Sequence, residues 1–275
     1  MSYLQPHAVE PIVGVTIGTM TFFDGLTSRS CLPDPVTLAR AAEQAGVRQI
    51  TLVFITTPTA EEQARFARVR AAAGIDVQLA MPFSDDVLAL VSALMPQRVR
   101  LQGIDLRALR DHSKFGEPSI AYTRLAQMIG ALRARGVGVV LPIGLDVEQV
   151  ATASALGAER VEIDLGSDLV ESESESANAL VRGTVRAVLD SAADLGMPVV
   201  LSGDLALSAL AGLAELRGVG QIELGAQLME PTILTGWTSA ITDCLAQLAG
   251  RAQQPLVHGD YGDVSTVAPS AGRSP

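Results

Sequence analysis

Three carboxylic acids lie in or at the ends of apolar segments, where a folded chain could use them to transfer protons. Glu162 lies in "VEIDLG" (161–166), Asp204 ends the apolar run in "VVLSGDLAL" (199–207), and Glu223 lies in "GQIELG" (220–225). A carboxyl group among apolar side chains has a raised pKa, which suits a general acid or base near neutral pH. We therefore predict that Glu162, Asp204 and Glu223 are catalytic.

Other side chains of these segments and their neighbours could contact a small molecule. Strand alternation places Asp164 on the same face as Glu162, and Gly225 on the same face as Glu223. The predicted substrate-binding residues are Thr16, Thr19, Val53, Ile55, Gln78, Ala80, Met81, Arg100, Gln102, Asp164 and Gln227. They predict a mainly apolar wall with a few acids. An alternative for Glu162 is a buried structural ion pair with Arg100.

One local pattern recurs along the chain and must position these residues. An Ala-rich helical stretch ends at a glycine, and an apolar strand follows within a few residues. The copies cover 41–55, 70–81, 132–144, 153–166, 192–204 and 214–225, and further strands are expected at 11–18 and 98–103. Eight strands, each followed by a helical segment, predict an α/β fold, a single-domain TIM (β/α)8 barrel. A doubly wound open sheet is the alternative, but it often has a Gly-rich phosphate turn, which this sequence lacks.

The composition of the chain and of its two ends limits the predicted cellular location and binding partners of the protein. The barrel is expected over 11–250, after an N-terminal segment (1–10) and before a flexible tail (251–275) rich in Pro, Gly and Ser. The net charge of −10 opposes binding to nucleic acid or acidic membranes. The sequence has no long apolar span or signal peptide, and Cys31 and Cys244 are far apart, which predicts a cytoplasmic protein with reduced thiols.

The positions of the lysine and histidine residues disfavour further classes of catalytic site. The single lysine, Lys114, falls in the loop after the fourth strand, which disfavours a Schiff-base enzyme. The three histidines, at 7, 112 and 258, lie outside the expected strands, so neither a histidine base nor a His-rich metal site is predicted.

Several segments resemble the pyridoxine 5′-phosphate synthase family. These are "GVTIG" at the first strand, "PDPVTLARAAEQAGVRQIT" (33–51), "VEIDLG" (161–166) and "LGAQLMEPTILTGW" (224–237), and the similarity extends over about 12–248. The resemblance implies a TIM barrel with extra helices, an octamer built from dimers, no cofactor, and a ring closure that joins deoxyxylulose phosphate to aminoacetone phosphate. It also implies that Glu162 and Glu223 point into the barrel and that Asp204 lies at its mouth.

Most of the family's catalytic residues are replaced in this chain. Thr16, Gly18 and Thr19 stand where the family has Asn, Asp and His on the first strand. The family's His base corresponds to Val53, the Arg two residues later to Ile55, its catalytic Glu to Ala80, and its proton-donating His to Asp204. Glu162, which matches a residue that stabilises charge in the transition state, is retained. The resemblance therefore argues against vitamin B6 synthesis.

The segment after the eighth strand is also unsuited to a phosphate. Glu230 and Pro231 stand there, where the resembled family has Gly and Arg. An acidic side chain repels a phosphate, and proline lacks the N–H group that would bind one. The predicted substrate is therefore not a phosphate ester.

Three function hypotheses follow. The first is a cofactor-independent cyclase, dehydratase or isomerase that acts on an uncharged, largely apolar small molecule in specialised (natural-product) metabolism. The second is a non-catalytic relative that binds a ligand or partner, and the third is a divalent-metal isomerase using Glu162, Asp204 and Glu223. A homo-oligomer is expected because the chain is apolar for a monomer and resembles an octameric family.

Overall fold

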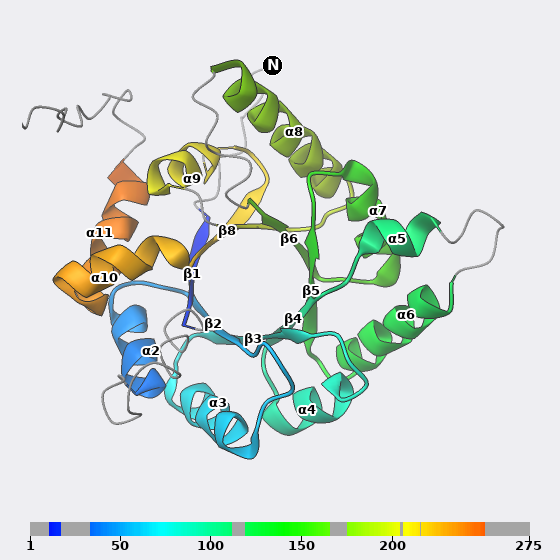
Figure 1. The fold of residues 1–275 in the computed structure, drawn as a ribbon, viewed down its shortest axis with the longest axis horizontal. Coiled ribbons are helices and arrows are strands. Elements are labelled where there is room, and N and C mark those ends of the chain that lie inside the picture. The colour runs from blue at the N-terminus through cyan, green and yellow to red at the C-terminus, as the bar shows by residue number, and fades with distance from the viewer. Residues whose placement is uncertain are drawn as a thin grey trace, which may run out of the picture.

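Eight parallel strands close into a barrel in the computed structural model, and helices surround it (Figure 1). The structure describes residues 11–17, 34–111, 119–165, 175–203, 206–214 and 216–250. The strands are β1 (Ile12–Thr16), β2 (Gln49–Val53), β3 (Asp76–Pro82), β4 (Arg98–Gln102), β5 (Gly138–Ile143), β6 (Arg160–Asp164), β7 (Val199–Ser202) and β8 (Val219–Leu224). Each strand pairs with its sequence neighbours, and β1 pairs with β8, so the predicted TIM barrel is confirmed.

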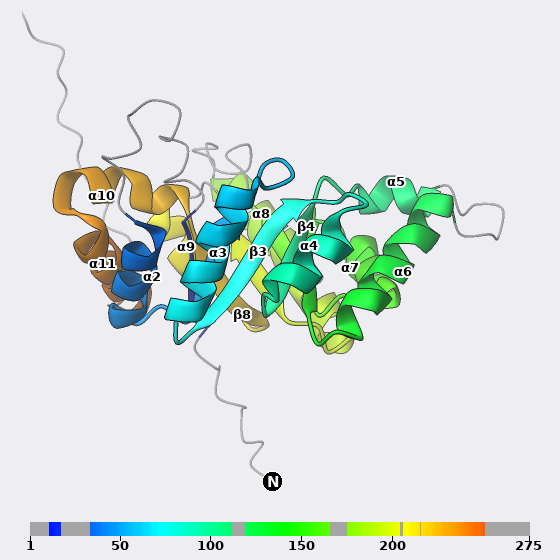
Figure 2. The ribbon, with the colours of Figure 1, turned by 90° about the horizontal axis from the view of Figure 1, so that it is seen from below.

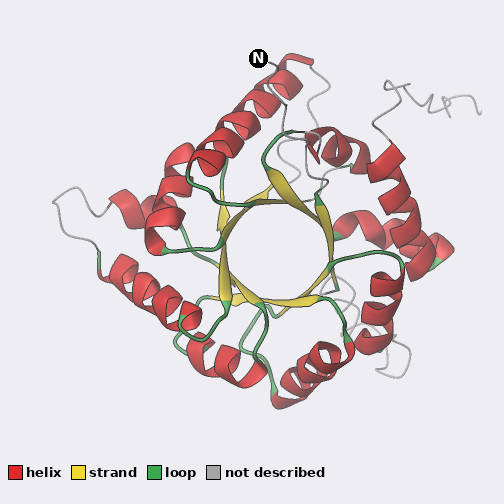
Figure 3. Ribbon diagram, turned by 180° about the vertical axis from the view of Figure 1, so that it is seen from behind, coloured by secondary structure: helices red, strands yellow, loops and turns green. Residues whose placement is uncertain are grey.

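Helices alternate with the strands and form the outer ring (Figure 3). They are α2 (Pro35–Gln44), α3 (Ala60–Ala72), α4 (Val87–Leu94), α5 (Leu106–Asp111), α6 (Ile120–Arg133), α7 (Val147–Leu156), α8 (Glu175–Asp194), α9 (Leu207–Ala214), the 3₁₀ turn η5 (Ala226–Leu228), α10 (Met229–Thr235) and α11 (Trp237–Gly250). The last helix, α11, packs against α2 and α9 and so completes the ring. The short helices α5 and α10 lie at the same end of the barrel (Figure 2), the end at which the strands finish.

The predicted helix-ending glycines adopt the left-handed conformation at five of the six repeats. Gly157, for example, has φ 85° as the C-cap of α7, and its N–H group bonds the carbonyl groups of Ala153 and Ser154. A left-handed residue allows a helix to end within one residue, and glycine adopts it without steric cost. Gly74 is the exception, because α3 ends on Ala73 in an extended conformation and the Gly74 N–H group donates to the Glu43 carboxylate at 3.2 Å.

Because the side chains of each strand alternate between two faces, the protein has two separate interior regions, an apolar core and the lumen of the barrel. The apolar core lies between the sheet and the helices and contains, for example, Leu79 and Met81 of β3 and Val161 and Ile163 of β6, all fully or almost fully buried. The alternate residues of the same strands face the lumen of the barrel. The predicted terminal segments, 1–10 and 251–275, lie outside the described residues.

Candidate functional site

The lumen of the barrel is filled largely by polar side chains. Eight polar or charged residues of the described chain are buried: Gln49, Thr51, Gln78, Arg100, Glu162, Ser202, Gln221 and Glu223. All of them come from strands, and the small apolar residues Ala80, Val140 and Val200 lie between them on the same face. A mainly apolar wall, predicted for the ends of the strands, therefore does not describe the lumen as a whole. The apolar residues that dominate each strand in the sequence alternate with these polar ones, and most of them pack on the helices.

Glu162 forms a buried ion pair with Arg100 in the centre of the lumen. Its Oε1 atom accepts hydrogen bonds from Arg100 Nη1 and from Ser202 Oγ, the latter at 2.6 Å. Arg100 belongs to β4 and Glu162 to β6, so the guanidinium group crosses the intervening strand β5 next to Val140. The ion pair expected as the alternative for Glu162 is therefore present.

Glu223 is the second buried carboxyl group of the lumen. Its Oε1 atom accepts a hydrogen bond from Thr16 Oγ1 at 2.8 Å, and its Oε2 atom accepts one from Gln221 Nε2 at 3.1 Å. Burial raises the pKa of Glu223, and the negative charge of Glu162 adds to this effect; a hydrogen bond with Thr51 and the charge of Arg100 act in the opposite direction. The net pKa shift is upward, so the carboxyl group of Glu223 holds its proton more tightly than an exposed glutamate does.

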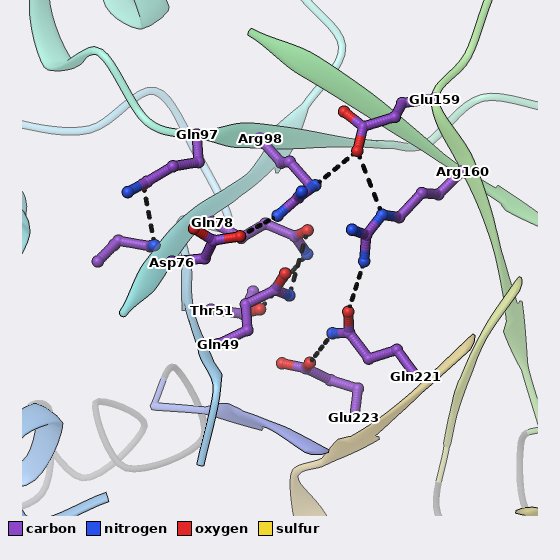
Figure 4. Close-up of polar contacts among 11 residues, drawn as sticks. Gln49, Thr51, Asp76, Gln78, Gln97, Arg98, Glu159, Arg160, Gln221 and Glu223 are labelled. Carbon is purple, nitrogen blue, oxygen red and sulfur yellow. Dashed lines mark hydrogen bonds and ion pairs between the residues drawn. The ribbon is translucent and has the colours of Figure 1, made fainter. Parts of the chain in front are cut away.

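A second polar network closes the end of the barrel at which the strands begin (Figure 4). Arg98 forms ion pairs with Asp76 and Glu159, the latter at 2.8 Å, and Glu159 also contacts Arg160 at 3.3 Å. Arg160 Nη1 donates to Gln221 Oε1 at 2.8 Å, and Gln221 in turn donates to Glu223. Through Gln221, this network holds the carboxyl group of Glu223 from the end of the barrel at which the strands begin.

The structure brings most of the predicted site residues to the lumen. Thr16, Gln78, Arg100, Glu162 and Glu223 are joined there by hydrogen bonds, ion pairs or shared partners. Nearer the ends of the strands, Val53 pairs with Ala80 on the same face as Thr51 and Gln78. Gln102 and Asp164 follow Arg100 and Glu162 by two residues, and Asp164 is exposed.

Three predicted residues are placed differently, and two are not described. Met81 faces the helices and belongs to the apolar core, because adjacent residues of a strand point to opposite faces. Ile55 lies beyond the end of β2 and is 80% exposed. Gln227 joins the ends of two strands: it accepts from the Gly225 N–H group at 3.0 Å and donates to the Gly203 carbonyl oxygen. Thr19 and Asp204 lie outside the described residues.

Gln49 and four residues around the two carboxyl groups belong to the lumen but are not among the predicted site residues. Thr51, Ser202 and Gln221 contact the two carboxyl groups, and Gly14 lies beside Glu223. A signal was available, because Gln221 precedes Glu223 by two residues and Gln49, Thr51 and Val53 alternate in the same way. Within the described ranges, no group of three or more His, Cys, Asp or Glu side chains could hold a metal ion. No helix in this part of the chain is long and apolar enough to cross a membrane.

Comparison with known proteins relates most of the chain to one family. The model of the family described as "Pyridoxal phosphate biosynthesis protein PdxJ" matches residues 27–250. Pyridoxine 5′-phosphate synthase of Xanthobacter autotrophicus is 28% identical over 230 residues, which cover 80% of this chain and 87% of that protein. The enzyme of the same name from a Jannaschia species is 27% identical over 225 residues, which cover 79% of this chain and 88% of that protein.

Solved structures show the same fold at low sequence identity. A mutant tryptophan synthase alpha-subunit from Pyrococcus furiosus aligns with a TM-score of 0.57 and 12% identity, covering 88% of this chain and 98% of the other. An aldolase described as 4-hydroxy-2-oxoglutarate aldolase/2-deydro-3-deoxyphosphogluconate aldolase from TTHB1 aligns with a TM-score of 0.56 and 15% identity, covering 88% and 96%. These similarities concern the barrel alone.

Proposed function

The chain belongs to the family of the pyridoxal phosphate biosynthesis protein PdxJ, and from this premise we propose that it is a cofactor-independent enzyme other than pyridoxine 5′-phosphate synthase. Its reaction is a cyclisation, dehydration or isomerisation of an uncharged, largely apolar small molecule, in specialised (natural-product) metabolism. The observation that carries this proposal is Glu223, a fully enclosed carboxyl group with a raised pKa beside the Arg100–Glu162 ion pair.

The surroundings of Glu223 suit proton transfer. A neutral carboxyl group can donate its proton to a substrate, and the carboxylate that forms is stabilised by Arg100 and by the hydroxyl group of Thr16. Glu162 holds the guanidinium group of Arg100 in place while this charge develops. Asp204, which follows β7, is the proposed partner that exchanges protons at the mouth of the barrel.

The mouth supports an uncharged substrate with apolar parts. Val53 and Ala80 are paired on the lumen face, where the family resemblance implies a His base and a Glu, and neither can transfer a proton. Pro82 and Pro142 lie on the same face near the ends of β3 and β5. Such walls bind hydrocarbon surface and exclude water from the carboxyl groups below.

Proton exchange with solvent tests this function on a mixture of compounds, so that no single substrate has to be chosen in advance. The protein is incubated with an extract of neutral small molecules in D₂O, and the extract is analysed by mass spectrometry. We expect at least one compound to gain deuterium or to be converted by the wild type, and Glu223→Gln to leave it unchanged. Absence of any conversion or labelling, together with tight retention of one compound, would instead establish a non-catalytic binding protein.

Three further properties complete the proposal. We propose that the protein is a homo-oligomer and that it is located in the cytoplasm. A monomer mass from light scattering at micromolar protein concentration would contradict the homo-oligomer. The partner of the barrel is a small molecule, and neither nucleic acid nor a membrane. The alternative of a divalent-metal isomerase predicts metal in the purified protein, which elemental analysis detects.

A further inference from the structure

One buried nitrogen of the Arg100 side chain makes no hydrogen bond within the described chain. Its Nη1 atom bonds Glu162, but its Nε atom is buried and has no hydrogen-bond partner. The side chain is only 10% exposed. A buried donor that makes no hydrogen bond destabilises a protein, so such a group calls for a specific explanation.

Glu162, the acceptor in this ion pair, also uses only one of its two carboxyl oxygen atoms toward the described residues. Both hydrogen bonds that Glu162 accepts within the described chain end on Oε1, from Arg100 and Ser202. The charge of Arg100 is therefore already balanced by Glu162 through one oxygen atom. Arg100 is the only cationic side chain among the buried residues of the described chain.

We infer that Arg100 Nε–H is a subsite for a neutral carbonyl oxygen of the ligand, such as that of a ketone, lactone or amide. This inference rests on the proposed function, because the ligand is the molecule that enters the lumen. A carbonyl oxygen supplies the missing acceptor without adding charge. A carboxylate or phosphate would place a second negative charge beside Arg100, whose positive charge already pairs with Glu162.

The surrounding arginines support the assignment to Arg100. Arg98 Nε already donates to Glu159 Oε1 at 2.8 Å, and Arg160 Nε contacts the same oxygen at 3.3 Å. Both lie at the closed end of the barrel, on the first residues of β4 and β6. Arg100 follows Arg98 along β4 on the same face and lies nearer the mouth, in register with Ala80. It is thus the arginine of the lumen that a ligand entering from the mouth would meet.

Nuclear magnetic resonance of the arginine side chains tests the subsite directly. Protein labelled with ¹⁵N-arginine is titrated with cyclohexanone, and with cyclohexanecarboxylate as a charged probe of the same ring. We expect a saturable downfield shift of the Arg100 Hε resonance with cyclohexanone and none with the carboxylate. The Hε resonance of Arg98 is the internal control, because its hydrogen bond to Glu159 is already formed and should not change.

A substitution gives an independent measurement. Arg100→Lys keeps the positive charge beside Glu162 but removes the Nε–H group, and we expect it to weaken cyclohexanone binding by about tenfold or more, the scale of a hydrogen bond to a charged group. Arg68→Lys is the control, because Arg68 lies on α3 in an exposed ion pair with Asp34, and it should leave cyclohexanone binding unchanged. If Arg100→Lys does not fold, the titration of the wild type decides, with the Arg100 resonance assigned through its backbone.

The outcomes separate this inference from the proposed function. An Arg100 Hε resonance that cyclohexanone does not move overturns the inference, as does a larger response to the carboxylate, which would indicate an anion subsite. A saturable response to the ketone in a protein that exchanges no proton with any compound retains the subsite and rejects the enzyme. Proton exchange without a response at Arg100 retains the enzyme and rejects the subsite.

Discussion

Gly14 and Glu223 lie directly opposite each other on the neighbouring strands β1 and β8, and the Glu223 carboxyl group occupies the space that a side chain at position 14 would need. A β-carbon at Gly14 would overlap Glu223 Oε2 and come within 2.8 Å of Gln221 Nε2. The glycine therefore makes room for a carboxyl group inside the barrel. This relationship links the first strand to the proposed acid and leads to the first prediction.

Gly14→Ala should destabilise the protein by about 1–3 kcal/mol, because the added methyl group overpacks the lumen. It should also lower turnover, because Glu223 must move away from Thr16. Denaturant unfolding measures the first effect. Gly130→Ala is the matched control: Gly130 lies in α6 with no neighbour in reach of a new β-carbon, so this change should stabilise the helix by about 0.5–1 kcal/mol. Equal stability of wild type and Gly14→Ala would show that Glu223 repositions freely.

Glu223→Gln should lower turnover by about 10²-fold or more, the usual effect of losing a general acid or base. The amide keeps the size of the side chain and can still accept the hydrogen bond from Thr16, so the fold should persist. Asp204→Asn should lower turnover to a similar degree with little change in melting temperature, because we propose that Asp204 lies at the mouth, where a side chain supports little packing. Full activity of both variants would mean that the carboxyl groups are structural and that the pocket acts by shape.

Stability should depend on pH through Glu223. Its folded-state pKa is raised above the ordinary value of 4.5, so the folded protein binds more protons than the unfolded chain between the two pKa values. The free energy of unfolding of the wild type should therefore fall, relative to Glu223→Gln, as the pH rises from 4.5 through the raised pKa. Below 4.5 the difference should be constant. Parallel stability curves for the two proteins across this range would contradict a raised pKa at Glu223.

Arg100→Met should destabilise the protein by about 3–5 kcal/mol, because it leaves the Glu162 carboxylate buried without its ion-pair partner. Adding Glu162→Gln should recover part of this loss, and a double-mutant cycle measures the coupling. Glu162→Gln alone should reduce turnover by about 10²-fold or more if the pair serves proton transfer. Arg68→Met is the control, since its ion pair with Asp34 is exposed and should contribute at most about 1 kcal/mol.

The purified protein should form no pyridoxine 5′-phosphate from deoxyxylulose phosphate and aminoacetone phosphate. Val53 and Ala80 lie side by side on the lumen face, where the resemblance implies a His and a Glu, and their side chains cannot transfer protons. A synthase of known activity, such as that of Xanthobacter autotrophicus, serves as the positive control. Product above the level of a blank would show that other residues of this lumen perform the family reaction.

The sequence alone determined the barrel and the acids within it. Eight apolar segments, six of which follow a helical stretch that ends at or near a glycine, have few compact arrangements other than a closed parallel sheet covered by helices. The spacing of two residues also put Glu162 with Asp164, and Glu223 with Gly225, on common faces, because side chains of a strand alternate with a fixed period. These are local properties, and so they can be read along the chain.

Only the tertiary structure decided what the acids contact. Arg100 and Glu162 are 62 residues apart, and Thr16 and Glu223 are 207 residues apart, so closure of the barrel creates both contacts. The character of the lumen was likewise decided by closure: the strands look apolar in sequence, yet most of their apolar residues, including Met81, pack on the helices. Polar side chains such as Thr51, Ser202 and Gln221 remain to fill the interior, because each finds its hydrogen-bond partner on another strand or two residues along its own.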